Sequence, residues 1–367
     1  MNRLLTSVSL ASLLLLAVPA RAELQVTLGG YVGFQAAVFD NDAANNSNRD
    51  FQSESEIHVK VKGLADNGLE YGALIELRTS VSDSQNTDEA NLWLSNRWGR
   101  FELGDQDGAG SELAELTPYV GIGQVRGSYI DFVTAADRGH SPSEAGMDSN
   151  LKAIDTADAT KVTYYTPRLQ GFQAGISYAP ERDSSASGEV VQFLDNTGNH
   201  DNAIELGLNY MGELSGLGIK VGGQYTHADT KSVSTLEDIS AWSLGTQLTY
   251  NSFTLGGGYT HNGDSGQAAG VTRDNVTGWN VGATYSSGPW GVGISYASIN
   301  FDNAATPFGA TGATGAGGDY TVYGVGGVYK IAPGLTAAAD IVVYDRNRVT
   351  GTDTNGYVAI TEIRAAF

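Results

Sequence analysis

The sequence predicts an all-β chain that closes into an antiparallel, up-and-down transmembrane barrel of sixteen strands. Three observations lead to this prediction. Apolar and polar residues alternate with a period of two, short and long connections take turns along the chain, and no run after the N-terminal region reaches about 18 consecutive apolar residues. The composition agrees, because 48 glycines and 18 tyrosines with only 8 prolines are typical of strands and turns.

The first 22 residues form a separate segment. A short basic start, Met1-Asn2-Arg3, precedes a mostly apolar stretch at 4–18, and Ala20-Arg21-Ala22 has the A-x-A form of a signal-peptidase site. Residues 1–22 are therefore predicted to be a cleaved signal peptide, and residues 23–367 a single barrel domain. The chain has no cysteine, so no disulfide stabilises this domain.

The net charge of −20 argues against nucleic acid as a partner, because a nucleic-acid-binding surface needs a basic patch. The same acidity favours solubility and attracts cations.

The alternation assigns each strand two faces. In IHVKVK (57–62) every second residue is apolar, and a strand places the two sets on opposite sides. Apolar residues recur at the same spacing in later runs: 73–77, 204–210, 219–225, 242–250, 279–285 and 290–296.

The connections alternate in length, as expected when short turns face one side of a membrane and long loops face the other. Seven are short: 64–69, 95–100, 166–171, 211–218, 250–253, 286–290 and 330–335. Eight are long: 39–50, 79–88, 107–159, 179–202, 227–238, 261–276, 298–319 and 345–356. They join sixteen strands, and this even number places both termini on the same side of the membrane.

Tyrosines mark both ends of the predicted strands, as two interfacial aromatic girdles require. Four precede long loops (Tyr178, Tyr225, Tyr259, Tyr296), and four precede short turns (Tyr210, Tyr250, Tyr285, Tyr329). The final run YVAITEIRAAF (357–367) is predicted to close the barrel, with Tyr357, Ile363 and Phe367 toward lipid and Glu362 and Arg364 toward the lumen.

Several stretches resemble the Gram-negative general porins over about residues 24–367. They are SESEIHVKVKGLADNGLEYGALIELRTS (53–80), DEANLWLSNRWGRFELGDQDG (88–108), KVTYYTPRLQGFQAGISYAPE (161–181) and the C-terminal Phe367. The resemblance implies a homotrimer in the outer membrane of a Gram-negative bacterium that passes small hydrophilic solutes and ions by diffusion. It also implies periplasmic termini, contact with outer-membrane lipid and lipopolysaccharide, and recognition of Phe367 by the barrel-assembly machinery.

In this family the third long loop folds into the lumen, and the resemblance assigns that role to residues 107–159. The loop offers constriction carboxylates at Asp107, Glu112, Glu115, Asp131 and Asp137. The alternative is an external loop with no role in the pore. Candidate residues of the pore wall are His58, Lys60, Lys62, Arg78, Asp88, Arg100, Lys161 and Tyr165. Because His58, Asp88 and Tyr165 stand where enteric porins carry arginines, we expect no strong arginine cluster. Acidic residues on the polar face of the strands, Glu54, Glu56, Glu76, Glu102, Glu205 and Asp340, predict a mild preference for cations.

The sequence bears differently on two other functions. A substrate-specific channel, for a sugar or another small solute, remains open because Tyr119, Tyr129 and Phe132 lie in the long loop. An enzyme is not expected, because the chain has neither a G-x-S-x-G elbow nor a Gly-Lys phosphate loop. No histidine has metal-ligand spacing to a partner, so we expect no metal and no cofactor. Ca²⁺ held by an acid-rich loop such as 40–50 stays an alternative.

Overall fold

A computed structural model describes residues 24–41, 47–78, 87–133, 151–182, 200–232, 234–267, 269, 276–301, 318–348 and 352–367. The first eight strands are β1 (Gln25–Asn41), β2 (Arg49–Leu64), β3 (Glu70–Arg78), β4 (Thr87–Asn96), β5 (Gly99–Asp105), β6 (Thr160–Tyr165), β7 (Phe172–Glu181) and β8 (His200–Leu214). The second eight are β9 (Leu217–Thr230), β10 (Ile239–Tyr250), β11 (Phe253–Gly263), β12 (Val276–Ser287), β13 (Trp290–Phe301), β14 (Gly318–Ala332), β15 (Leu335–Arg348) and β16 (Thr354–Ala366). Three short helices separate β5 from β6: α1 (Ala109–Leu113), η1 (Gln124–Arg126) and η2 (Ser128–Phe132).

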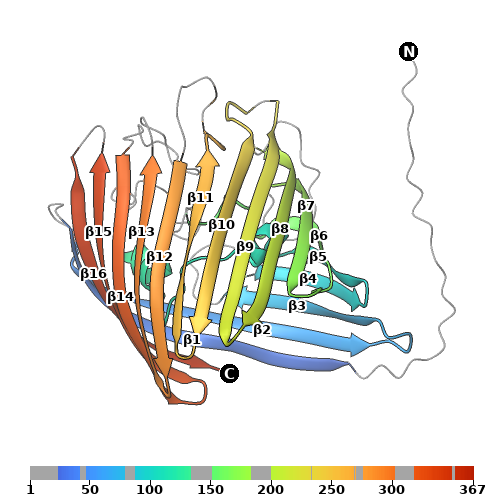
Figure 1. The fold of residues 1–367 in the computed structure, drawn as a ribbon, viewed down its shortest axis with the longest axis horizontal. Helices are drawn as coiled ribbons and strands as arrows, with labels where there is room; N and C mark the ends of the chain where they lie inside the picture. The colour runs from blue at the N-terminus through green and yellow to red at the C-terminus, as the bar shows by residue number, and fades with distance from the viewer. Residues whose placement is uncertain are drawn as a thin grey trace.

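The sixteen strands form one closed antiparallel barrel (Figure 1). Each strand pairs with its neighbours in sequence, and β1 pairs with β16 to close the ring. The seam continues to the last residue, because the backbone N–H of Phe367 donates to Gly30 O at 3.0 Å and Gly30 N–H donates to Phe367 O at 3.1 Å. The predicted strand number and the closing role of residues 357–367 are confirmed. Closure pairs the backbone groups of what would otherwise be two exposed edges.

The two faces of the wall differ as the alternation predicts. On β10, Trp242 and Leu244 expose 42% and 56% of their surface outward, whereas Ser243 between them points into the barrel and is 5% exposed. An outward face of large apolar side chains suits a lipid solvent, in which no water is present to hydrate polar groups. Among the described residues, no helix is both long enough and apolar enough to span a membrane.

Aromatic rings pair on the outer surface at both ends of the strands. Next to short turns, Tyr210 contacts Phe172 with ring centroids 4.8 Å apart, and Tyr329 contacts Trp290 at 4.4 Å. Next to long loops, Tyr296 packs on Trp279 at 4.7 Å. This arrangement agrees with two interfacial girdles.

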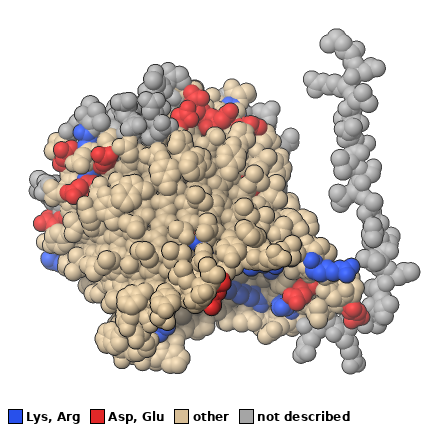
Figure 2. All heavy atoms as spheres, viewed as in Figure 1, with Lys and Arg blue, Asp and Glu red and all other residues tan. Residues whose placement is uncertain are grey.

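The charged side chains on the visible surface are unevenly distributed. Figure 2 shows acidic side chains gathered along the upper edge, with a broad band below them that is nearly without charge.

The barrel height is uneven, because β5 and β6 have 7 and 6 residues whereas β1 has 17. The predicted signal peptide, Asp137 and residues 42–46 of the 40–50 loop lie outside the described residues.

Candidate functional site: a loop inside the barrel

The segment between β5 and β6 contacts side chains that point into the barrel. The backbone N–H of Thr117 donates to Asn280 Oδ1 on β12 at 2.7 Å, and Gln124 N–H donates to Asp340 Oδ2 on β15 at 2.7 Å. On the returning part, Thr260 Oγ1 of β11 donates to Leu151 O at 2.6 Å. Because these partners lie on the inward face, the described parts of the segment, 107–133 and 151–159, lie within the lumen (Figure 1).

A row of inward-facing glycines accommodates this segment. One glycine from each of the eight neighbouring strands β7 to β14 faces it; we call the row the glycine belt: Gly175, Gly207, Gly222, Gly245, Gly256, Gly282, Gly293 and Gly324. A Cβ atom on Gly207 would lie 2.3 Å from Ala109 O, and one on Gly222 would lie 2.3 Å from Leu113 O. Such distances are far below ordinary van der Waals contact, so a side chain at either position would displace the segment.

The belt and the segment run in the same direction. A Cβ atom would lie 1.7 Å from Glu115 O at Gly245, 2.1 Å from Thr117 Oγ1 at Gly282 and 2.7 Å from Gln124 Cβ at Gly324. The segment therefore follows the wall from β7 toward β14 with its backbone close to the strands. Glycine within a strand weakens it and often marks a close approach of another backbone, which is its role here.

An apolar core fixes the middle of the segment. Val125 and Tyr129 are 0% and 1% exposed, and they belong to a cluster with inward-facing Val342, Val358 and Ile360 from β15 and β16. Apolar side chains on the luminal face depart from the expected polar lumen. The reason is that this part of the wall faces the segment rather than water, and burying these groups holds the two together.

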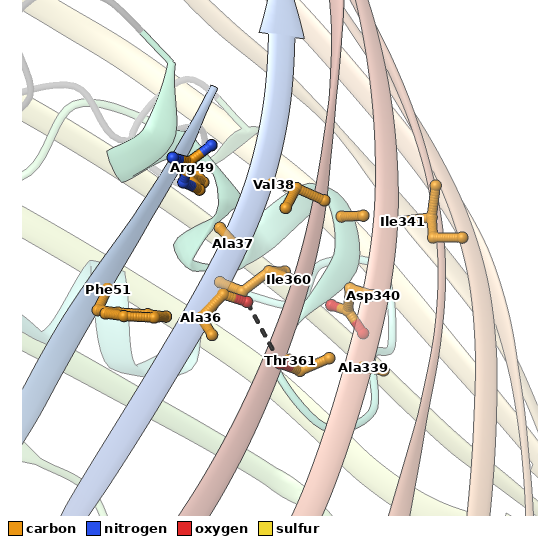
Figure 3. Close-up of a pocket in the computed structure, with 11 residues that line it drawn as sticks. Ala36, Ala37, Val38, Arg49, Phe51, Ala339, Asp340, Ile341, Ile360 and Thr361 are labelled. Atoms are coloured by element: carbon orange, nitrogen blue, oxygen red, sulfur yellow. Dashed lines mark hydrogen bonds between the residues drawn. The ribbon is translucent and has the colours of Figure 1, made fainter. Parts of the chain in front are cut away.

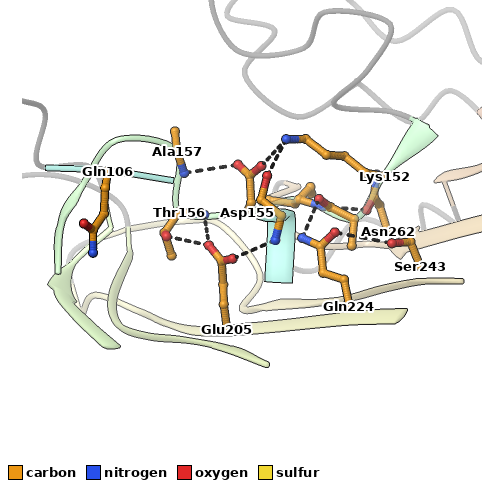
Figure 4. Close-up of polar contacts among 12 residues, drawn as sticks. Gln106, Lys152, Asp155, Thr156, Ala157, Glu205, Gln224, Ser243 and Asn262 are labelled. Atoms are coloured by element: carbon orange, nitrogen blue, oxygen red, sulfur yellow. Dashed lines mark hydrogen bonds and ion pairs between the residues drawn. The ribbon is translucent and has the colours of Figure 1, made fainter. Parts of the chain in front are cut away.

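A polar network fixes the returning part of the segment (Figure 4). Glu205 on β8, fully buried, accepts hydrogen bonds from the backbone N–H and the hydroxyl of Thr156, both at 2.5 Å. Lys152 pairs with Asp155 at 2.9 Å. Burial alone would raise the pKa of Asp155, but the Lys152 ammonium and the N–H of Ala157 hold it well below its usual range. Asp155 is therefore ionised and anchors the segment at neutral pH.

A hollow of about 510 Å³ remains between the segment and the wall of β3 to β8. The segment contributes Asp107, Glu112 and Leu113, and the wall contributes Leu74, Glu76, Glu89, Asn91, Arg100, Glu102, Tyr165, Arg168, Gln173, Asn209 and Met211, with Gln106 at the edge. Burial raises the pKa of both Asp107 and Glu112 above the usual range. Four predicted site residues, Asp107, Glu112, Arg100 and Tyr165, thus line one space.

The arginines of the wall are matched by nearby carboxylates. Arg78 lies 2.7 Å from Asp88 and 3.5 Å from Glu56. Arg100 contacts Glu102 at 2.5 Å, and its guanidinium stacks over Trp93 at 4.3 Å from the ring centroid. These pairs reduce the positive field that the arginines present to a solute.

The other predicted wall residues have different surroundings. His58 lies 2.9 Å from Glu56, and Lys62 pairs with Glu70 at 2.9 Å. Lys60 is exposed on β2. Lys161 lies on β6 as predicted, but its ammonium is buried and donates to the backbone carbonyls of Gln106 and Ala157. Lys161 therefore joins the two ends of the luminal segment, and its charge does not face open water.

Two of the predicted loop carboxylates lie outside the hollow. Gln52 Nε2 donates to Asp131 Oδ2 at 3.0 Å, which links η2 to β2. Glu115 is 9% exposed beside the glycine belt, and burial raises its pKa.

Sequence reasoning missed Asp158, whose pKa is raised to about 7 by burial and by the nearby charges of Asp88 and Asp107. Its position just before β6 was the only available signal.

Comparisons with known proteins agree with this architecture. The model of the Gram-negative porin family matches residues 9–349. An uncharacterized protein of Rickettsia bellii is 24% identical over 370 residues, covering 83% of this chain and 80% of its own. A porin of Rhodobacter capsulatus is 29% identical over 97 residues, or 26% of this chain and 32% of its own.

Solved structures share the fold. The trimer form of OmpT, an outer membrane protein of Vibrio cholerae, superposes with a TM-score of 0.61 at 14% identity, covering 93% of this chain and 99% of its own. A porin refined at 1.8 Å resolution gives 0.59 at 16% identity, covering 94% and 100%. With a closed barrel, a luminal segment and a family match across most of its length, this chain belongs to the Gram-negative porins and forms a channel in the outer membrane.

Proposed function

We propose that the barrel is a water-filled pore for passive diffusion of small hydrophilic solutes and ions, that residues 107–159 constrict it, and that it prefers cations mildly. The composition of the hollow is the observation that carries this proposal. Carboxylates outnumber arginines in its lining, because Glu76, Glu102, Asp107 and Glu112 stand against Arg100 and Arg168. A passing cation is attracted by this excess and an anion is repelled.

The preference is mild for two physical reasons. At physiological ionic strength charges are screened over about 8 Å, so a wet pore transmits only part of the field. In addition, burial raises the pKa of Asp107 and Glu112, which lowers their ionised fraction when the pH falls toward the acidic range. Both effects reduce discrimination without closing the path to neutral solutes.

The three aromatic residues of the long loop that kept a sugar-specific channel open give that function little support. Tyr129 is 1% exposed and packs in the apolar core, and Phe132 packs against that core beside Phe39, with ring centroids 5.8 Å apart. Of the three aromatic residues, Tyr119 alone is exposed, and it lies under Arg126. A stacking track needs consecutive exposed rings, so general diffusion is favoured.

Removal of two carboxylates tests the cation preference. The double variant Asp107→Asn/Glu112→Gln keeps the shape of the hollow and removes two negative charges. Its reversal potential in a salt gradient should move toward zero, with single-channel conductance near that of the wild type. Asp66→Asn, in the exposed turn between β2 and β3, is the matched control and should leave the reversal potential unchanged. An unchanged reversal potential in the double variant contradicts the assignment.

We also propose a homotrimer, because OmpT of Vibrio cholerae, which shares this fold, was solved in a trimer form. A groove on the outer face of β1, β15 and β16 supplies a surface for a second copy (Figure 3). Three of its outward side chains are small, Ala36, Ala339 and Ala359, and larger exposed side chains, Val38, Ile341 and Phe51, line it beside them. Ala359→Trp should fill the groove and shift the detergent-solubilised protein from trimer to monomer by light scattering, whereas an unchanged trimer excludes this face.

The remaining expectations concern export and assembly. We propose that residues 1–22 are removed on export, that both termini face the periplasm, and that the barrel-assembly machinery recognises the β16 terminus. The outer face would contact lipid and lipopolysaccharide. The two Phe367–Gly30 hydrogen bonds support a role for the last residue in closing the seam. Deletion of Phe367 should lower the folded fraction recovered from outer membranes, and full recovery would contradict this role.

A further inference from the structure

Two carboxylates and an imidazole converge on the luminal face of β2 and β3. Glu56 and His58 are two residues apart on β2 and therefore share a face, and Glu76 on β3 is the direct cross-strand partner of His58. The imidazole Nε2 lies 2.9 Å from Glu56 Oε2 and 3.6 Å from Glu76 Oε1. One ligand atom from each residue lies within 4.8 Å of the other two.

These separations suit a small divalent cation. Zn²⁺ binds nitrogen and oxygen ligands at about 2.0–2.2 Å, so neighbouring ligand atoms of a tetrahedral site are about 3.3 Å apart. The distances of 2.9 and 3.6 Å to His58 Nε2 lie on either side of this value. The set of one imidazole and two carboxylates leaves a fourth position for water, as in three-ligand zinc sites.

The surrounding groups orient the ligands. Arg78 Nε lies 3.5 Å from Glu56 Oε1, the oxygen that does not face His58, so Oε2 stays available. The charge of Arg78 is in turn shared with Asp88 at 2.7 Å. Such outer contacts fix the orientation of a ligating carboxylate. With neutral His58, the three ligands carry a charge of −2, which matches a divalent cation.

We propose that Glu56, His58 and Glu76 form a binding site for a divalent transition-metal ion of the Zn²⁺ class on the pore wall. The binding itself is independent of transport. Its consequence for the current rests on the proposed pore function: a bound dication removes two negative charges from the lumen and occupies part of its cross-section, so the cation current falls. An ordinary hydrogen bond between His58 and Glu56 predicts neither effect.

Calorimetric titration of the folded, detergent-solubilised protein with ZnCl₂ tests the binding. The wild type should bind one Zn²⁺ per chain at this site. His58→Ala should abolish that binding, and Glu76→Gln should weaken it at least about tenfold, since both remove a ligand. The matched control is His227→Ala, because His227 also pairs with a carboxylate, Asp229 at 3.3 Å, but belongs to no three-ligand group among the described residues. Equal binding by wild type and His58→Ala, or none by the wild type, overturns the proposal.

A bilayer recording separates this proposal from the proposed function. Zn²⁺ should lower the conductance of wild-type and His227→Ala pores and leave Glu76→Gln pores nearly unaffected. If the pores conduct, show no response to Zn²⁺ and bind none by calorimetry, the metal site is refuted. The proposed channel function is then unaffected. Stoichiometric Zn²⁺ binding by a protein that passes no current refutes the channel and supports the metal site.

Discussion

Adding one methyl group at Gly245 should displace the luminal segment. In Gly245→Ala the new Cβ would lie 1.7 Å from Glu115 O, and contacts of real Cβ atoms are rarely below 3.0 Å. To restore a separation of 3.0 Å, the backbone near Glu115 must move by about 1.3 Å (3.0 minus 1.7), and overpacking of this kind costs about 1–3 kcal/mol. Strand β10 blocks movement outward, so the segment can move only further into the open part of the lumen.

This displacement should narrow the pore. The measurements are single-channel conductance in a planar bilayer and the thermal unfolding of the detergent-solubilised barrel. Both should fall in Gly245→Ala relative to the wild type. The matched control is Gly223→Ala on β9, where a Cβ would find its nearest neighbours at 3.6 Å on the outer face. If both variants show wild-type conductance and stability, the glycine belt does not position the segment and our reasoning is refuted.

Three further predictions concern the anchors and charges of the luminal segment. Glu205→Ala should lower the free energy of unfolding by about 1–3 kcal/mol and increase current noise, because two buried donors of Thr156 lose their acceptor; unchanged thermal unfolding would contradict this. Lowering the pH from 8 to 6 should reduce cation preference, because the Asp158 pKa of about 7 lets that group protonate in this range; Asp158→Asn should lose this component of the pH response. The raised pKa means that Asp158 binds its proton more tightly in the folded state than in the unfolded state. Its contribution to the free energy of unfolding should therefore fall as the pH rises from about 4 to 7. Chemical unfolding of Asp158→Asn should lack this pH-dependent contribution.

The barrel could be predicted because its signals are local. Period-two alternation assigns the faces of β10 without any knowledge of its neighbours, and alternating loop length gives the strand number. The closing role of residues 357–367 followed from the need to pair every backbone group in lipid. The ends of the strands were predicted less accurately: β1 extends to Asn41, two residues beyond the predicted start of its loop, because its pairing with β16 continues to Asn41 opposite Gly356.

The interior of the barrel could not be predicted to the same extent, because it depends on contacts between distant segments. A glycine such as Gly245 gives no sequence signal that a loop backbone will lie against it. Val358 and Ile360 contradict a polar lumen until the packing of Tyr129 against that wall is known. Glu56, His58 and Glu76 likewise lack metal-ligand spacing in the sequence, because the register between β2 and β3 brings them together.

The central claim, an open pore lined by excess negative charge, is tested most directly by planar-bilayer recording of the purified protein under a salt gradient. We predict large ohmic current steps, closing in groups of three, and a reversal potential with the sign of a modest cation preference. Absence of conductance by a correctly folded barrel would contradict the channel, and a reversal potential of the opposite sign would contradict the role assigned to the carboxylates of the hollow.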